Sequence, residues 1–249
     1  IPVMKSKKKW LDLFGNRTKS RIENQILPEF LKVQRWFGSK SKKILKINIT
    51  ETIPIKNQNS NSLILILKVT YAYGPEEYYH LPLSFLEIDK AATILQEKPN
   101  LVLLQYQSSK GDGIIYDSVL DKDFHQTILQ FVAKRRVIKT SEGKLKAYPG
   151  KYFKNIRRKI ESFEQSNPLN TEQSNTSILY GHELIYKLFR KLDEGINPDL
   201  EIVKYITEKT DYKNIPSFAG AIEYQKKDGS LLTLGILYPF VQSEGNMWD

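Results

Sequence analysis

Hydrophobic and polar residues alternate along much of the first half of the chain. Strand-like patterns run over residues 44–55, 63–73 and 78–85, and turn-forming residues separate these three segments. A two-residue period is typical of half-buried β-strands, so an antiparallel meander is expected here. Two more strands, over residues 101–107 and 113–119, are expected on either side of a Gly-Asp-Gly turn.

Helical patterns lie on both sides of these strands. Ser20 and Glu23 form a capping-box pattern, which predicts a helix start, and residues 1–19 before it are interpreted as a basic lead-in with one hydrophobic anchor. A second helix is expected from Asp121, because hydrophobic residues follow it at helical spacing. Helices packed on a curved antiparallel sheet make an α+β module, which we expect over residues 20–150.

The segment from Glu172 to Glu201 shows a different pattern. It opens with small polar residues whose hydroxyl, amide and backbone N–H groups suit a phosphate-binding loop. These residues are Ser174, Asn175, Thr176 and Ser177. Two short hydrophobic runs follow and meet at Gly181, where a hairpin turn needs a positive φ. Because side chains alternate along a strand, Lys187 on the second run shares a face with Ile185 and is held on a rigid element.

A helix is expected directly after this hairpin. Asn197 is a good N-cap, Pro198 suits the first helical position and Asp199 complements the helix dipole. A phosphate loop, a strand lysine and a helix carboxylate are, in this order, the parts with which kinase-type folds hold the phosphates of ATP. We therefore predict that Glu201, one turn into the helix, pairs with Lys187 and directs its ammonium group toward the phosphates.

The end of the chain is expected to complete a small sheet. Two further strands are predicted on either side of an Asp-Gly turn at Asp228. Residues 151–249 would then contain about five antiparallel strands and one helix. Tyr238 and Phe240 follow the last strand, and their backbone groups are predicted to contact the adenine edge of ATP, because Pro239 between them lacks an N–H.

Several strings in the chain resemble the N-terminal half of bacterial maltokinases. They are LPEFLKVQRWFGSK from Leu27, EQSNTS from Glu172, KLFRKLDEGINPDLEI from Lys187 and IPSFAGAIEY from Ile215. The first string is similar to the LPxYLxxxRWFxxK opening of that family. Such kinases transfer phosphate from ATP to the anomeric hydroxyl of maltose, and they share a fold with aminoglycoside phosphotransferases and protein kinases.

The resemblance implies an antiparallel-sheet cap followed by a protein-kinase-like N-lobe. The ATP-binding residues would be Ser174, Asn175, Thr176, Ser177, Lys187, Glu201, Tyr238 and Phe240. The Mg²⁺ ligands, the maltose site and the catalytic base are expected in a C-lobe beyond this chain, so no catalytic and no metal-binding residue is assigned here. The parent protein would form maltose 1-phosphate in trehalose and α-glucan metabolism, and the fragment alone is expected to be inactive.

Composition limits the other interpretations. The chain has no cysteine, which excludes disulfides and thiolate metal sites and favours a reducing cytoplasm. The three histidines, His80, His125 and His182, lack the spacing of metal ligands. The longest hydrophobic run, residues 63–67, is too short to cross a bilayer. The net charge of +10 is spread over scattered clusters without a nucleic-acid-binding motif, so neither a nucleic acid nor a membrane partner is expected.

Two other functions stay open. In many bacteria the maltokinase segment is fused to a trehalose synthase, and the lead-in around Trp10 and Phe14 resembles that junction, so the parent would also interconvert maltose and trehalose. The second alternative is a non-catalytic basic module that binds an acidic partner, with Lys187 and Glu201 as a solvated pair. On fold analogy, an aminoglycoside or another small hydroxylated acceptor is also compatible.

Overall fold

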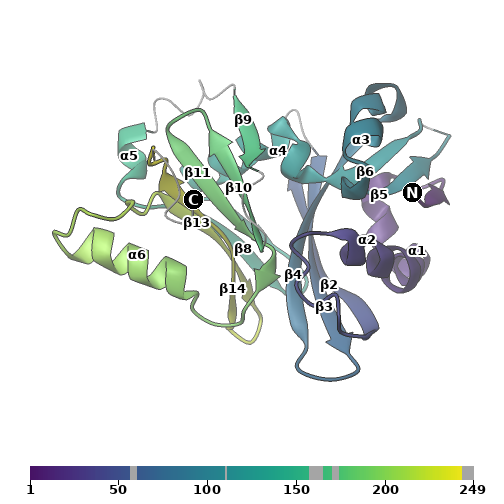
Figure 1. Cartoon of the computed structure of the whole chain (residues 1–249), viewed down its shortest axis with the longest axis horizontal. Coiled ribbons are helices and arrows are strands. Elements are labelled where there is room, and N and C mark those ends of the chain that lie inside the picture. The colour runs from purple at the N-terminus through teal and green to yellow at the C-terminus, as the bar shows by residue number, and fades with distance from the viewer. Residues whose placement is uncertain (57–60, 110, 157–164, 170–173, 243–249) are drawn as a thin grey trace. The chain divides into compact units, whose positions relative to one another are not determined.

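The computed structural model describes residues 1–56, 61–109, 111–156, 165–169 and 174–242, and its fold is mixed α/β (Figure 1). It divides into two compact units. Unit 1 comprises Ile1–Thr127 and Arg190–Asp193, and unit 2 comprises Ile128–Phe189 and Glu194–Asp249. This division differs from the expected boundary at residue 150, because strand β8 (Gly143–Pro149) pairs with a strand of unit 2 along its whole length.

Unit 1 is built on a seven-stranded sheet with the order β1-β5-β6-β4-β3-β2, in which β12 also pairs with β4. Its strands are β1 (Val3–Lys5), β2 (Ile44–Lys56), β3 (Asn61–Tyr71), β4 (Glu77–Glu87), β5 (Val102–Gln107), β6 (Gly113–Asp117) and β12 (Lys191–Leu192). Its α-helices are α1 (Asn16–Arg21), α2 (Leu27–Val33), α3 (Ala92–Glu97) and the first part of α4 (Lys122–Ala133). Shorter helical segments are η1 (Trp10–Phe14), η2 (Ile22–Ile26), η3 (Ile88–Lys90), η4 (Pro99–Leu101) and η5 (Ser118–Leu120). The predicted antiparallel meander is confirmed as β2-β3-β4.

The first helical region begins earlier than the capping-box pattern predicts. The helical segments α1, η2 and α2 follow one another from Asn16 to Val33, so Ser20 lies inside a helix. Glu23 instead accepts a hydrogen bond from the backbone N–H of Ile49, at 2.6 Å. The residues expected to form a lead-in are part of the fold, because β1 pairs in parallel with β5 and Phe14 is buried. Such a pairing joins distant parts of the chain, which local patterns do not reveal.

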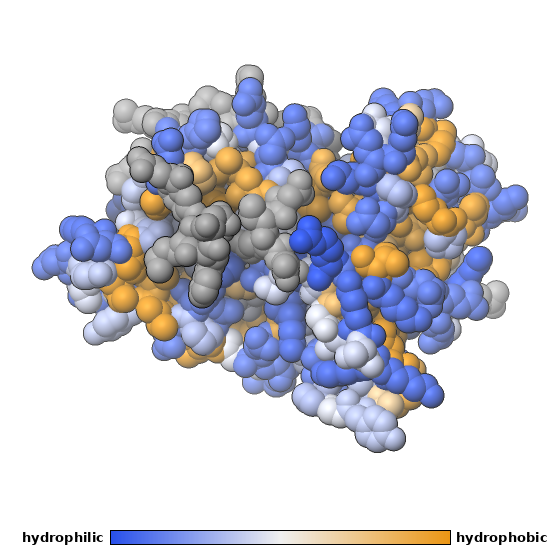
Figure 2. All heavy atoms as spheres, in the orientation of Figure 1, coloured by the Kyte–Doolittle hydropathy of each residue, from blue (hydrophilic) through white to orange (hydrophobic). Residues whose placement is uncertain are grey.

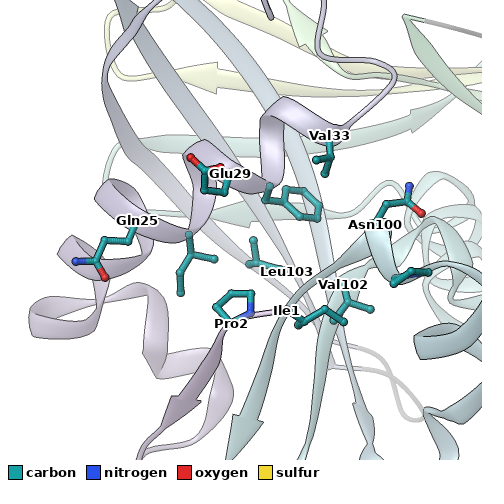
Figure 3. Close-up of a pocket in the computed structure, with 11 residues that line it drawn as sticks. Ile1, Pro2, Gln25, Glu29, Val33, Asn100, Val102 and Leu103 are labelled. Carbon is teal, nitrogen blue, oxygen red and sulfur yellow. The ribbon is translucent and has the colours of Figure 1, made fainter.

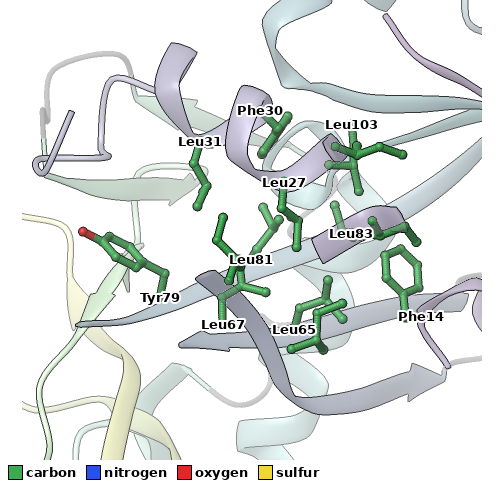
Figure 4. Packing of buried hydrophobic residues seen from close by; sticks show 14 of the residues in the cluster. Phe14, Leu27, Phe30, Leu31, Leu65, Leu67, Tyr79, Leu81, Leu83 and Leu103 are labelled. Atoms are coloured by element: carbon green, nitrogen blue, oxygen red, sulfur yellow. The ribbon is translucent and has the colours of Figure 1, made fainter. Parts of the chain in front are cut away.

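The core of unit 1 lies between helix α2 and the strands β3 and β4 (Figure 4). Buried leucines from these strands pack below the helix: Leu65, Leu67, Leu81 and Leu83. From the helix, Leu27 and Leu31 point toward them (Figure 4), and the buried Phe30 belongs to the same cluster. Farther along β4, the Tyr79 ring lies 5.1 Å from the Phe37 ring, centroid to centroid. Strand β4, which lies between β6 and β3, is therefore a buried central strand of the sheet.

Unit 2 is built on a second seven-stranded sheet, whose order is β7-β8-β13-β14-β11-β10-β9 and whose neighbouring strands are all antiparallel. Its strands are β7 (Val137–Lys139), β8, β9 (Ser166–Leu169), β10 (Asn175–Tyr180), β11 (Leu184–Phe189), β13 (Gly220–Lys226) and β14 (Leu231–Pro239). Its helices are the second part of α4, α5 (Phe153–Ile156) and α6 (Pro198–Lys209). The predicted hairpins at Gly181 and Asp228 are confirmed, and Gly181 has a φ of 55°.

Hydrophobic residues reach the surface along helix α6. Ile202 and Tyr205 on this helix are both more than half exposed, and hydrophobic surface is visible over α6 in Figure 2. These two residues are three positions apart and share one side of the helix, so this side of α6 is an exposed apolar surface. Within the described ranges, no helix combines the length and the apolar character that crossing a membrane requires.

Candidate functional site

Unit 2 contains a pocket of about 450 Å³, a volume in the range of small-molecule sites. It is formed by strand β11, helix α6 and the end of β14 with the residues that follow it. Apolar side chains dominate its lining: Ile185, Ile202, Val203, Pro216, Pro239, Phe240 and Val241. Lys187, Asp199 and Tyr238 contribute the polar groups.

Lys187 is held on an inner strand of the sheet. Strand β11 lies between β10 and β14, and the residue directly opposite Lys187 on β10 is Ser177. The predicted alternation is confirmed, since the residues on the other face of β11 are buried: Leu184, Tyr186 and Leu188. The Lys187 side chain is 29% exposed, and its Nζ lies 5.4 Å from the centroid of the Phe189 ring. A paired strand therefore fixes where this ammonium group emerges.

Asp199 reaches the pocket from the first turn of α6. The predicted helix start is confirmed, because Pro198 is the first helical residue and the Asn197 side chain accepts a hydrogen bond from Leu200 N, at 3.3 Å. The Asp199 carboxylate accepts a hydrogen bond from Lys187 Nζ at 2.8 Å. A half-exposed lysine and an exposed acid from two different elements thus meet at one place on the pocket.

The prediction that Glu201 pairs with Lys187 is wrong, because Asp199 makes this contact in the described structure. The reason is helical geometry. Residues two positions apart are rotated by about 200° around a helix of 3.6 residues per turn, so the two acids point to nearly opposite sides. The residues that share the side of Asp199 are Ile202 and Val203, three and four positions on, and both line the pocket. Glu201 is exposed.

The four residues predicted to form a phosphate loop are mostly strand residues. Asn175, Thr176 and Ser177 lie in β10, and only Ser174 precedes it. Strand β10 starts earlier than predicted because it also pairs with β9 on its other side, with Ser177 opposite Leu169. Residues 170–173, between β9 and β10, lie outside the described part of the chain. The ten described lining residues of the pocket include none of these four.

Tyr238 and Phe240 both line the pocket, but the backbone of Phe240 is already engaged. Its N–H donates a hydrogen bond to Glu183 O, at 2.9 Å. Burial, together with the nearby Asp199 carboxylate, raises the pKa of the Tyr238 phenol above its usual value, so this side chain is a neutral hydroxyl at physiological pH. The two residues therefore offer aromatic surface and one hydroxyl.

The lining of the pocket does not fit a magnesium site. Mg²⁺ prefers octahedral oxygen ligands, with one or two carboxylates beside water and phosphate. Asp199 is the one carboxylate among the described lining residues, and it already forms an ion pair with Lys187. Across the part of the chain that the structure describes, no cluster of three or more His, Asp or Glu side chains could hold a metal ion.

A pocket of about 310 Å³ in unit 1 provides a contrast (Figure 3). It lies beside helix α2 and the start of β5, and Pro2, Val102 and Leu103 line it with other apolar residues. Its polar side chains are Gln25, Glu29 and Asn100. The described lining contains no lysine, arginine or histidine, so this pocket offers no side-chain cation to a phosphate.

Sequence reasoning missed several residues of the unit 2 pocket. The sequence indicates Asp199 only as a helix-start residue and assigns no role to Val203 and Pro216. A signal for Val203 is present, since it lies four positions after Asp199, on the same side of a helix. Pro216 comes from an irregular segment, for which sequence periodicity carries no information.

Comparison with protein families agrees with the sequence resemblance. Residues 30–121 match the family model described as the maltokinase N-terminal cap domain. The resemblance to the N-terminal region of maltokinases is thereby confirmed, and it indicates a maltokinase-related protein. All matched residues belong to unit 1, so the match does not include the pocket of unit 2.

Proposed function

We propose that this chain binds ATP in the pocket of unit 2, as the nucleotide-binding part of a maltokinase-related sugar kinase. The observation that carries the proposal is the 2.8 Å ion pair between Lys187 and Asp199 on the lining of a mostly apolar pocket. In kinase-type sites a carboxylate directs a strand lysine, whose ammonium group then meets the phosphates. In this proposal, Asp199 and not Glu201 is the carboxylate that directs the Lys187 ammonium group.

The apolar part of the pocket suits the adenine base. Ile185 and Val203 supply aliphatic surface, and Tyr238 and Phe240 supply aromatic rings. An aromatic ring contributes large contact area and can stack on a planar base. Because the Phe240 N–H is bonded to Glu183 O, we assign Phe240 a contact through its ring rather than through its backbone N–H.

The phosphates would extend from the base toward Lys187. Its position on β11 places the ammonium group beside Ser177, since directly opposed residues of an antiparallel pair lie on the same face. Ser177 is buried, whereas Asn175, two positions earlier on the same face of β10, is half-exposed. Of the four residues first considered, we therefore retain Asn175 as the proposed phosphate contact, and Ser174 and Thr176 receive no separate role.

Maltose is proposed as the acceptor on the basis of the sequence resemblance and the family match over residues 30–121. In the reaction the γ-phosphoryl group would pass from ATP to the anomeric oxygen of the sugar, which loses its proton to a base, and ADP would leave. We assign no residue of the pocket as this base, because Asp199, the one acid among its described lining residues, is engaged by Lys187. Fusion to a trehalose synthase stays a prediction.

The affinity of the chain for ATP tests the proposal. Lys187→Met should weaken ATP binding about tenfold or more, because a hydrogen bond to a charged group contributes roughly 1.5–3 kcal/mol. Lys146→Met is the matched control: Lys146 is a half-buried lysine on β8 of the same sheet, and it bonds Gln225 Oε1 at 2.9 Å instead of lining the pocket. Isothermal titration on the three proteins should show the loss for Lys187→Met alone. Equal binding by all three proteins, or a wild-type chain that does not bind ATP, would contradict the proposal.

One observation favours a second function, the binding of an acidic partner by unit 1. Four lysines line a pocket of about 380 Å³: Lys32, Lys42, Lys43 and Lys46. Two of them are already paired, Lys32 with Glu29 at 2.8 Å and Lys42 with Glu77 at 3.1 Å, which reduces the positive field. If this surface binds acidic chains, exchanging Lys43 and Lys46 for glutamate should abolish binding to polyglutamate at low salt. If the double variant binds polyglutamate as well as the wild type does, or if the wild type does not bind it, this function is excluded.

A further inference from the structure

Backbone contacts in unit 2 hold the stretch that leads into helix α6. The Gly195 N–H donates a hydrogen bond to Leu231 O at 2.9 Å, and Glu194 forms an isolated bridge with Leu232. Both contacts precede the first helical residue, Pro198, and belong to unit 2. They fix where the helix starts, but a helix held by the backbone at one end can still turn about its own axis.

The rotation of α6 about its axis decides which acid reaches Lys187. Asp199 and Glu201 are two positions apart, which corresponds to about 200° around the helix, and the observed contact is the 2.8 Å hydrogen bond to Asp199. A half-exposed ion pair contributes little energy, so the pair itself holds this rotation only weakly. Side-chain contacts farther along α6 are therefore needed to keep Asp199 on the pocket.

Thr207 attaches the far end of α6 to the sheet of unit 2. Its hydroxyl accepts a hydrogen bond from Phe218 N at 3.2 Å and donates one to Val203 O at 2.7 Å. Phe218 is 1% exposed and lies just before strand β13. Asp199, Val203 and Thr207 follow one another at four-residue intervals, so they form one row along the helix. Holding Thr207 against Phe218 therefore also holds the side of α6 that carries Asp199.

Lys204 makes a second contact between α6 and the sheet. It lies three positions before Thr207, and its Nζ is 4.8 Å from the centroid of the Tyr148 ring and 5.8 Å from that of the Phe218 ring. The Tyr148 ring on β8 is itself held, because its hydroxyl donates a hydrogen bond to Glu223 Oε2 at 2.8 Å. A cation is attracted to the face of an aromatic ring. Two side chains, three positions apart, thus bind one side of α6 to unit 2.

We propose that two side chains, Thr207 and Lys204, set the rotation of α6. They thereby make Asp199, rather than Glu201, the carboxylate that pairs with Lys187. This inference rests on the proposed function, because the pair matters for ATP only if the nucleotide binds beside it. Thr207 and Lys204 are positioning residues, since neither is among the described residues that line the pocket.

Two threonines near the end of α6 allow a matched test. Thr207 and Thr210 each donate a hydrogen bond to the carbonyl four positions earlier, at 2.7 and 2.6 Å. The Thr207 hydroxyl accepts its second bond from the buried Phe218, whereas the Thr210 hydroxyl accepts from the N–H of the exposed Tyr212, at 3.3 Å. Exchange to valine removes the hydroxyl at either position and keeps the branched shape of the side chain.

The first readout does not depend on nucleotide. A small amine-reactive reagent acetylates Lys187 at a rate that reports whether Asp199 still covers the ammonium group, and peptide mass spectrometry measures this rate. Asp199→Asn gives the rate for a lost pair. Thr207→Val should raise the rate toward this reference. Thr207→Ser, which keeps the hydroxyl, and Thr210→Val should both keep the wild-type rate.

Variants of Lys204 test the second contact in the same assay. Lys204→Met should raise the Lys187 acetylation rate about twofold or more, because an exposed cation–π contact contributes less than a buried hydrogen bond. Lys204→Arg keeps the cation and should keep the wild-type rate. All variants are compared well below their Tm, where a loss of overall stability alone leaves the rate unchanged.

The affinity for ATP is the second readout. Thr207→Val should weaken ATP binding about fivefold or more, the lower end of typical coupling between sites, and Thr210→Val should leave it unchanged. If the wild-type chain does not bind ATP, the proposed function fails, and the acetylation rates alone decide the inference.

Equal Lys187 acetylation rates in Thr207→Val and Thr210→Val would overturn the inference, whatever the ATP affinity. A preparation of Thr207→Val that does not fold leaves the decision to Lys204→Met and Lys204→Arg. In that case, equal rates in these two variants would overturn the inference.

Discussion

The two units each contain a lysine–carboxylate contact, and the two contacts differ in almost every physical respect. In unit 1, Glu77 is 6% exposed and is bonded by Lys42, Lys191 and three hydroxyl groups. In unit 2, the Asp199 side chain is 52% exposed, and it forms an ion pair with Lys187. The Glu77 carboxylate is saturated with hydrogen bonds from its neighbours. In the second contact, both the Asp199 carboxylate and the Lys187 ammonium group remain partly exposed, so a ligand can reach them.

This difference separates a structural role from a binding role. A buried carboxylate needs hydrogen-bond partners inside the protein, and removing it leaves these partners unpaired and lowers the free energy of unfolding. A half-exposed pair contributes little to stability. A ligand can therefore bind its charged groups with little effect on the free energy of unfolding. Both members of the unit 2 pair line a pocket, whereas Glu77 is not among the described residues that line the two pockets of unit 1.

The largest expected effect is on the stability of unit 1. Glu77→Gln should lower the free energy of unfolding by about 3 kcal/mol or more, because it breaks a buried charged network. Urea unfolding followed by tryptophan fluorescence measures this change. A loss below about 1 kcal/mol, the range of surface pairs, would show that Glu77 is no more structural than Asp199.

The pH dependence of stability should also originate largely in unit 1. Burial lowers the pKa of His125 from 6.5 to about 4. Between these values the unfolded chain binds a proton that the folded chain excludes, so the free energy of unfolding should fall as the pH drops from 6.5 to 4. The loss is at most about 3 kcal/mol, at 1.36 kcal/mol per pKa unit.

Variants at two histidines test this origin. His125→Gln should flatten the pH dependence of the free energy of unfolding between pH 6.5 and 4. His182→Gln is the control, because His182 is exposed, and its curve should follow that of the wild type. If the free energy of unfolding depends on pH with the same slope in both variants, His125 is not the cause of the pH dependence.

The sheet behind the pocket of unit 2 should tolerate little change. A Cβ atom added to Gly235 would lie 2.3 Å from the Tyr186 hydroxyl, so Gly235→Ala should cost about 1–3 kcal/mol through overpacking. Gly38→Ala is the control, since a Cβ atom there meets nothing within 4 Å. Thermal unfolding should show a lower Tm for Gly235→Ala alone, and equal Tm values would contradict the packing described here.

The smallest expected effect on stability belongs to the proposed site itself. Asp199→Asn should change the free energy of unfolding by less than about 1 kcal/mol, as for other exposed pairs. The same urea experiment measures it beside Glu77→Gln. A loss as large as that of Glu77→Gln would mean that the Lys187–Asp199 pair stabilises the fold, and the contrast between the two units would disappear.

Local patterns predicted much of the fold. The strands β2, β3 and β4, the Gly181 turn and the Asn197 cap all depend on residues close together in the sequence, and the structure contains each of them. Buried and exposed residues alternate along β2, whereas β3 and β4 are buried on both faces over most of their length. These features follow from side-chain period and backbone preference. The same reasoning placed Lys187 on the correct face of β11.

Long-range contacts account for what could not be predicted. Strand β1 is defined by its parallel partner β5, and β12 is two residues long and gains its order from β4. Arg190 stands in a string of charged residues that resembles a solvated surface, but it is buried against Asp117 and Trp36, which are far away in the sequence. The choice of Asp199 over Glu201 depends on the rotation of α6 relative to β11, which the order of residues does not specify.

The central claim is that Lys187 meets the phosphates of ATP, and affinity labelling tests it most directly. An acyl-phosphate derivative of ATP transfers its acyl group to a lysine amine that lies beside the bound phosphates. We expect peptide mapping to find the acyl group on Lys187, and an excess of ATP to prevent the labelling. Labelling that spares Lys187 and falls on other lysines, such as Lys146 or Lys191, would contradict the account.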